Sequence, residues 1–150
     1  MKKQKGFSLI ELLIVVAIIL IIAAIAIPNL LRSKMAANEA SAVGSLRTIN
    51  TAEVTYSSTY GTGYADLSAL GTSGLLDSVL AAGTKSGYTF TAAATGGSGT
   101  STSPYTTYTS SGNPLNSSSG TRAFCSDGSG VIRYVIGLSG CVAGTSSPLQ

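Results

Sequence analysis

The chain opens with a long apolar segment. Residues 7–27 carry a single charged side chain, that of Glu11, and all sixteen residues from Leu12 to Ile27 are apolar. As a helix rising ~1.5 Å per residue, this segment spans ~32 Å, which matches the hydrocarbon core of a bilayer. A domain of this size has no core wide enough to bury a helix that is apolar on every side. The pattern therefore predicts a membrane-spanning helix.

The pattern becomes amphipathic after Pro28. Over residues 29–60 apolar positions recur mostly at spacings of three, four or seven, which is typical of one helical stripe. The stripe consists of Leu31, Met35, Ala42, Leu46, Ile49, Ala52 and Tyr56, and the rest of the helix surface carries Arg32, Lys34, Glu39, Arg47 and Glu53. We expect a nearly continuous helix from Phe7 to about Ser57, stopped by the glycines that follow.

Residues 61–150 are rich in Gly, Ser, Thr and Ala and predict a small head. Asp66 is placed to cap a short helix over residues 67–70, and residues 75–83 predict a second one. Strands are expected at 88–92, more weakly at 105–109, and on both sides of a turn at Asp127, at 122–126 and 131–136. Residues 94–119 are expected to form an exposed loop. The predicted fold class is α+β, with three or four antiparallel strands packed on the amphipathic half of the helix.

Composition narrows the chemistry. The chain has no His, so an imidazole base and a Ser-His-Asp triad are excluded, and its two Cys cannot complete a four-ligand zinc site alone. Its six acidic residues are scattered and show no pairing of two carboxylates. We therefore expect no enzyme activity, no catalytic residue, no metal site and no cofactor.

Charge is unevenly distributed. Lys2, Lys3 and Lys5 precede the apolar segment, which favours insertion with the N-terminus in the cytoplasm and the head translocated. The other six basic residues are dispersed and matched by six acidic ones. Because phosphate binding needs clustered bases, we expect no direct binding of nucleic acid.

Glu11 is out of place in an apolar segment. A charge within a membrane span costs ~2.5–3.5 kcal/mol on insertion scales, and such a residue is by default a functional candidate. Interaction with the helix dipole returns only ~0.3–1 kcal/mol. A partner outside the chain therefore explains Glu11 better than its position at a helix end.

The residues Lys-Lys-Gln-Lys-Gly followed by Phe-Ser-Leu-Ile-Glu resemble the start of the type IV pilin family and of the related secretion pseudopilins. In that family a short basic leader ends in Gly, cleavage exposes a methylatable residue that is commonly Phe, and Glu follows four positions later. Gly6, Phe7 and Glu11 occupy these places. The resemblance covers about the first thirty residues. Leu20 departs from it, since many members carry Gly there, so Pro28 alone is left to favour local helix melting in a filament.

The resemblance implies a domain organisation and a function. Residues 1–6 are the cleaved leader, 7–28 the transmembrane and polymerisation helix, 29–60 its amphipathic half and 61–150 the head. It also implies N-methylation of Phe7, an assembly role for Phe7, Glu11 and Pro28, and pairing of Glu11 with the new amino terminus of a neighbouring subunit. The expected protein is a major pilin, held in the inner membrane before assembly and in a surface filament afterwards. Its implied partners are copies of itself, a prepilin peptidase, an assembly platform and minor pilins.

Cys125 and Cys141 are the two cysteines of the chain. Translocation would carry them to an oxidising compartment, where a bridge closing a loop of this size contributes ~3 kcal/mol in the chain-entropy model. Their position also resembles that of the cysteines whose disulfide closes the C-terminal loop in many pilins. A redox-active pair would have the closer C-x-x-C spacing, so we expect a structural disulfide.

Two alternatives remain open from the sequence. Within the family, the chain fits a pseudopilin of a type II secretion system. In another class, it fits a secreted or single-pass anchored extracytoplasmic binding module, with Ala24-Ile25-Ala26 as a signal-peptidase site. Whether a pilus of this subunit serves adhesion, motility or DNA uptake is not encoded in any motif.

Overall fold

The computed structural model describes residues 6–149, so the basic leader residues Lys2, Lys3 and Lys5 lie outside the described part. The chain divides into two compact units, Met1–Lys34 and Met35–Gln150. One long helix, α1 (Leu9–Tyr60), belongs to both units. Its residues 9–34 lie in the first unit and its residues 35–60 in the second.

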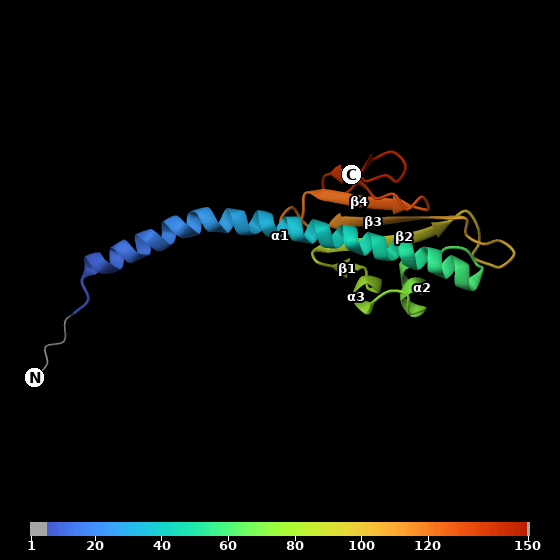
Figure 1. The fold of residues 1–150 in the computed structure, drawn as a ribbon, viewed down its shortest axis with the longest axis horizontal. Coiled ribbons are helices and arrows are strands. Elements are labelled where there is room, and N and C mark those ends of the chain that lie inside the picture. Colours follow the sequence, from blue (N-terminus) through green and yellow to red (C-terminus); the bar gives the residue numbers. More distant parts are fainter. Residues whose placement is uncertain (1–5, 150) are drawn as a thin grey trace, which may run out of the picture. The chain divides into compact units, whose positions relative to one another are not determined.

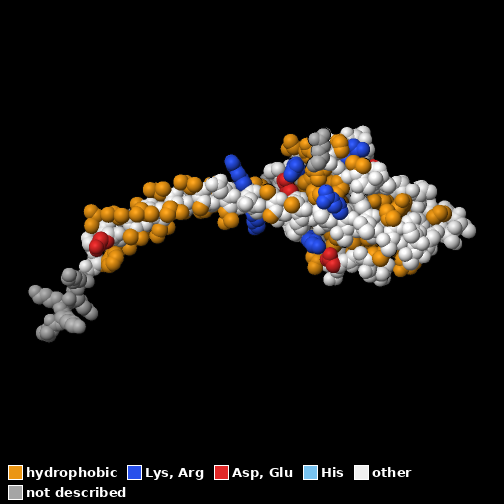
Figure 2. Space-filling model, viewed as in Figure 1, with side chains coloured by type: hydrophobic (Ala, Val, Ile, Leu, Met, Phe, Trp, Pro, Cys, Tyr) orange, Lys and Arg blue, Asp and Glu red, His pale blue; other side chains and the backbone are white. Residues whose placement is uncertain are grey.

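In the described part of the first unit, the large apolar side chains of the helix are exposed. Its large apolar side chains, from Phe7 to Leu31, are 44–80% exposed. Figure 2 shows hydrophobic side chains along the whole visible face of this stretch of α1. Pro28 lies inside the helix without ending it. The predicted helix is confirmed here, with its start at Leu9 instead of Phe7, since residues 6–8 are not helical.

The second unit is a head in which the later turns of α1 lie along an antiparallel sheet (Figure 1). Two short helices follow α1, namely α2 (Leu67–Thr72) and α3 (Ser78–Ala81). The six strands are β1 (Thr84–Lys85), β2 (Tyr88–Thr95), β3 (Thr107–Pro114), β4 (Arg122–Asp127), β5 (Arg133–Ile136) and β6 (Ser147–Pro148). Their order in the sheet is their order in the chain, so the sheet is a simple meander.

The predicted helical stripe forms the core of the head. Leu46 and Ile49 of α1 are completely buried, and they belong to one cluster with Phe90 and Phe124 of the sheet. Burying such a side chain contributes about 1.5–3 kcal/mol, and this is what holds the helix on the sheet. The α+β fold class is confirmed, with six strands where three or four were expected. Leu31 is half exposed and does not extend the stripe.

Two charged residues of α1 are placed differently from the prediction. Glu39 is 7% exposed and Glu53 is fully buried, although both were assigned to the outer surface of the helix. At about 100° per residue, Glu39 falls at the edge of the apolar stripe, whereas Glu53 falls within it, between Ala42 and Leu46. Both carboxylates find hydrogen-bond donors in the head. The helix also extends three residues beyond Ser57, to Tyr60, before Gly61 adopts a positive φ of 67°.

The predicted loop over residues 94–119 is wrong in its second half. Residues 107–114 form β3, which pairs along its whole length with β2 and places Gly112 opposite Phe90. A Cβ atom at Gly112 would lie 2.9 Å from the Phe90 ring, so the position requires glycine. Ser110 of the same strand is buried. Tyr108 is the one large apolar side chain on the buried face of β3, and Ser110 and Gly112 follow it there, so the strand lacks the apolar alternation by which strands are recognised.

The short elements follow their capping residues. Asp66 accepts the N–H of Ala69 at 2.7 Å and begins α2, as predicted. Asp77 accepts the N–H of Leu80 at 2.9 Å, so α3 starts at Ser78 and is shorter than the expected helix over 75–83. The turn at Asp127 joins β4 to β5 as predicted, although β5 begins at Arg133 instead of residue 131.

Candidate functional site

The segment before α1 is open to solvent. Gly6, Phe7 and Ser8 are exposed and have no regular secondary structure. Phe7 is 80% exposed, and a Cβ atom added at Gly6 would meet nothing within 4 Å. The peptide bond between Gly6 and Phe7, the predicted cleavage site, is therefore sterically accessible.

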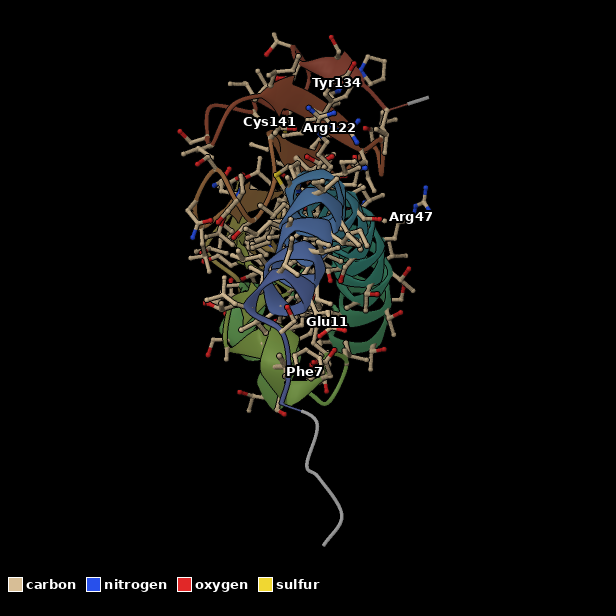
Figure 3. The ribbon with its side chains drawn as sticks, turned by 90° about the vertical axis from the view of Figure 1, so that its left-hand side faces the viewer. Phe7, Glu11, Arg47, Arg122, Tyr134 and Cys141 are labelled. Carbon is tan, nitrogen blue, oxygen red and sulfur yellow. A yellow bond between two sulfur atoms is a disulfide. The ribbon has the colours of Figure 1, made fainter. Side chains whose placement is uncertain are left out.

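Glu11 lies in the first turn of α1. Its Oε2 accepts the backbone N–H of Ser8 at 2.9 Å, which satisfies one of the free donors at the start of the helix. In the single chain Glu11 thus acts as a local cap (Figure 3). The predicted pairing with the amino terminus of another subunit requires a second copy and stays a prediction.

The stretch of α1 that follows Glu11 is suited to an apolar environment. Among the described residues, α1 is the one helix whose length and composition allow it to cross a membrane, and none of its most apolar window is buried. An exposed apolar surface of this extent marks an interaction with lipid or with other proteins.

Glu39 and Arg122 join α1 to the sheet. The Arg122 Nη2 and Nε atoms lie 2.7 Å and 2.8 Å from Glu39 Oε2, while Oε1 accepts both the N–H and the hydroxyl of Thr121. Burial alone would raise the pKa of Glu39, but the hydrogen bonds from Thr121 and Arg122 outweigh it and lower that pKa. The carboxylate is therefore ionised at neutral pH and holds the helix against the start of β4.

Aromatic rings position the arginine of this pair. The Arg122 guanidinium carbon lies 5.6 Å from the Phe124 ring centroid and 5.5 Å from that of Tyr134. Arg122 and Tyr134 are seen close together in Figure 3. Sequence reasoning missed this ion pair, because Glu39 and Arg122 are 83 residues apart and neither belongs to a motif.

Glu53 is a second buried carboxyl group, near the other end of the head. Its Oε2 accepts the N–H of Ala65 at 2.9 Å, while its Oε1 is buried without a hydrogen-bond partner in the described part of the chain. Burial raises the pKa of Glu53 to about 7, with a smaller contribution in the same direction from Asp66, against the opposing effect of the Ala65 hydrogen bond. This carboxyl therefore titrates near neutrality.

The predicted disulfide is present. Cys125 of β4 is bonded to Cys141 in the loop after β5, with the two Cα atoms 5.7 Å apart. The bond ties the end of the chain to a central strand of the sheet. It closes the C-terminal part of the head.

The described residues offer no evident centre for metal chemistry. Within residues 6–149, no group of three or more His, Cys, Asp or Glu side chains lies together. The carboxylates of Glu39, Asp66, Asp77 and Asp127 each accept hydrogen bonds from their own surroundings.

The N-terminal segment of the chain is similar to segments of known proteins. Residues 1–27 match the family model described as the prokaryotic N-terminal methylation motif. Over 39 residues the chain is 62% identical to the type IV wide pilus major component PilA4 of Thermus thermophilus. Over 54 residues it is 44% identical to the type IV major pilin protein PilA of Myxococcus xanthus. The N-terminal region of this chain is therefore similar to that of type IV pilins.

The match to type IV pilins is confined to part of each chain. It covers 26% of this chain and 30% of the Thermus protein, and 36% of this chain and 24% of the Myxococcus protein. The pilin recognition made on Gly6, Phe7 and Glu11 is thus confirmed for the segment that carries the motif. The long helix packed on a small antiparallel sheet agrees with it, since this is the pilin-like architecture expected from the sequence.

Proposed function

We propose that this chain is a structural subunit of a type IV pilus, most simply its major pilin, with no enzymatic activity of its own. The observation that carries the proposal is the bare apolar stretch of α1 directly after the Gly6–Phe7 junction. Such a surface is stable inside a bilayer. Once the subunit leaves the bilayer, it is stable only when other apolar helices surround it.

The proposed life cycle has two environments. In the inner membrane, residues 7–28 span the bilayer with the N-terminus in the cytoplasm, and the head lies outside, where the Cys125–Cys141 bond can form. A prepilin peptidase removes residues 1–6, and Phe7 becomes the methylated amino terminus. Copies of the chain then assemble through an assembly platform, together with minor pilins, into a filament with α1 at its centre.

Glu11 has the proposed assembly role. Cleavage after Gly6 creates an ammonium group at Phe7, and Glu11 offers a carboxylate that a neighbouring subunit's ammonium can pair with in an apolar interior. Unpaired, the charge would be costly there. Pro28 lacks a backbone donor and is the proposed place where α1 loosens locally in the filament.

The first test is the mature amino terminus and the assembly state. Edman or mass-spectrometric sequencing of the processed protein should give an N-methylated Phe7, and electron microscopy of sheared surface material should show filaments made of this chain. An amino terminus at Ile27 would indicate secretory cleavage, and one at Met1 an uncleaved anchor; either would overturn the proposal. The pseudopilin alternative shares the processing motif, and abundant surface filaments argue against it.

The second test separates the two roles of Glu11. Glu11→Gln keeps an oxygen that accepts the Ser8 N–H but removes the charge, whereas Glu11→Ala removes both. We expect both variants to insert into the membrane and both to lose filaments by about tenfold or more, because a missing charge pair in an apolar interior costs several kcal/mol. Normal filaments from Glu11→Gln would reduce Glu11 to a helix cap.

A further inference from the structure

Most charged side chains of the head have a partner or are buried, and two exposed ones, an acid and a base, do not. Glu39 is paired with Arg122, and Asp77 lies 3.2 Å from Lys85. Hydrogen bonds from Ser129 and the nearby charge of Arg133 both lower the pKa of Asp127, and Glu53 is buried. Among the described residues of the head, Asp66 and Arg47 are exposed and form no ion pair.

Asp66 lies in an aromatic groove. The groove has a volume of about 510 Å³ and lies between the last turns of α1 and the helix α2. Its lining consists of Tyr56, Tyr60, Asp66, Ser68, Ala69, Thr72 and Ser73. The two tyrosine rings are 4.5 Å apart and tilted by 32°, and Tyr60 is half exposed. No basic residue lines the groove, so its electrostatic preference is for a cation.

A guanidinium group fits this groove chemically. Tyrosine faces attract a cation that lies within about 6 Å of the ring centroid. A planar guanidinium can stack on such a ring and donate to a carboxylate at the same time, which a lysine ammonium does less well. Asp66 uses Oδ1 to cap α2 and keeps a second carboxylate oxygen that can accept from an arginine.

Arg47 lies on the other flank of α1. Nine residues separate it from Tyr56, which at about 100° per residue places the two on opposite sides of the helix. Figure 1 shows the same two flanks, with α2 and α3 on one side of α1 and β4 on the other. Arg47 is exposed and projects from the surface in Figure 3. It lines a hollow whose other lining residues are Ala36, Glu39, Ala40, Val43, Arg122 and Leu149.

We propose that Arg47 of one copy of this chain enters the Tyr56–Tyr60–Asp66 groove of the next copy in the filament. The proposal rests on the filament function proposed above and names a head-to-head contact within it. Since the two contact sites occupy opposite flanks, the contact is heterologous: each head gives an arginine to one neighbour and receives one from another. A heterologous contact repeated without closure builds a filament.

A charge swap in the full-length protein tests the contact. Arg47→Glu and Asp66→Arg each place like charges together, and we expect each to lower the yield of sheared filaments by about tenfold or more. The double variant restores opposite charges in reversed order and is expected to recover the yield to within about threefold of wild type. Asp66→Arg also removes the cap of α2 in both the single and the double variant, so recovery cannot come from the cap.

Controls keep folding and specificity apart from assembly. Each variant is checked for the Cys125–Cys141 bond and for the near-ultraviolet circular dichroism of the head. Lys85→Glu reverses a base already paired within its own head, and we expect filament yield to stay within about threefold of wild type. A loss equal to that of Arg47→Glu, or a folded double variant no better than its single parents, would overturn the proposal.

Cross-linking gives a second readout that leaves both charged residues in place. Gly44 lies one turn from Arg47 in open space, and Ser68 lines the groove. A chain carrying Gly44→Cys and Ser68→Cys should form a ladder of disulfide-linked subunits when its filaments are oxidised, while either change alone should not. Abundant filaments without a ladder would refute the contact, whereas a wild-type chain that forms no filaments would refute the proposed function itself.

Discussion

At the scale of single residues, two glutamates on the same helix have opposite electrostatic environments. Glu39 receives hydrogen bonds from Thr121 and Arg122, which lower its pKa, whereas burial raises the pKa of Glu53 to about 7. One carboxylate is thus stabilised by its surroundings, and the other is destabilised when it ionises. Both contact the head, so both affect how firmly α1 is held.

The pKa of Glu53 predicts a dependence of stability on pH. A glutamate ordinarily titrates at 4.5, so between pH ~4.5 and ~7 the folded head keeps a proton that the unfolded chain releases. The free energy of unfolding should therefore fall by about 3 kcal/mol as the pH rises through this range, and then level off. Glu53→Gln should abolish this fall, measured by thermal unfolding of the full chain in detergent.

Glu39→Gln is the matched control, because it makes the same change on the same helix. Here the carboxylate is the favoured form, so the substitution should destabilise the head by about 1–3 kcal/mol at pH 7. If Glu53→Gln behaved like Glu39→Gln and left the pH dependence intact, the buried carboxyl would not be its source.

The spacing of the helix indicates the burial of Glu53, which falls within the apolar stripe, but not that of Glu39, which lies at its edge. The helical stripe correctly placed Leu46 and Ile49 in the core, because their spacing alone determines the face they share. Whether a glutamate at the edge of that stripe is solvated depends on donors that come from far along the chain, at Thr121 and Arg122 for Glu39. That information is absent from local periodicity.

At the scale of secondary-structure elements, the pattern of apolar and polar residues failed to predict most of β3. The strand holds the middle of the sheet, yet its inward positions include Ser110 and Gly112, which local propensity assigns to loops. At Gly112 the absence of a side chain is dictated by Phe90 on the neighbouring strand. The capped helices were foreseen because Asp66 acts on residues only three positions away.

Two glycines provide a paired prediction. Gly112→Ala places a Cβ atom 2.9 Å from the Phe90 ring and should destabilise the head by about 1–3 kcal/mol. Gly44→Ala, in an open position on α1, should stabilise it by about 0.5–1 kcal/mol through helix propensity. Chemical denaturation of both variants measures the two effects, and equal effects would contradict the packing described for β3.

At the scale of the whole molecule, the disulfide is a main constraint that holds the C-terminal region of the head in place. Beyond Asp127 the chain contributes only two short strands, β5 and β6, and few buried side chains. The bond between Cys125 and Cys141 closes this region onto β4. Its pairing was foreseeable, since two cysteines allow one bridge.

Reduction should therefore loosen the end of the head before the rest. We expect no free thiol in the oxidised protein, and after reduction a loss of about 3 kcal/mol in the free energy of unfolding. Hydrogen exchange should rise first over residues 133–149 and little over β2 and β3. Uniform exchange across the sheet would show instead that the bridge supports the head as a whole.

The meander has a consequence for heads that are crowded together. The outermost strands of the sheet, β1 and β6, are two residues long each, and Pro148 removes a backbone donor from one of them. At the β6 end, an edge this short offers almost no ladder for a foreign strand to extend. At the other end, residues 90–95 of β2 continue past β1 without a strand partner on that side. At high local concentration the heads should therefore resist amyloid-like fusion through β6, and contact between copies at that end is left to side chains and to the apolar helix, which can be reversed without unfolding a sheet.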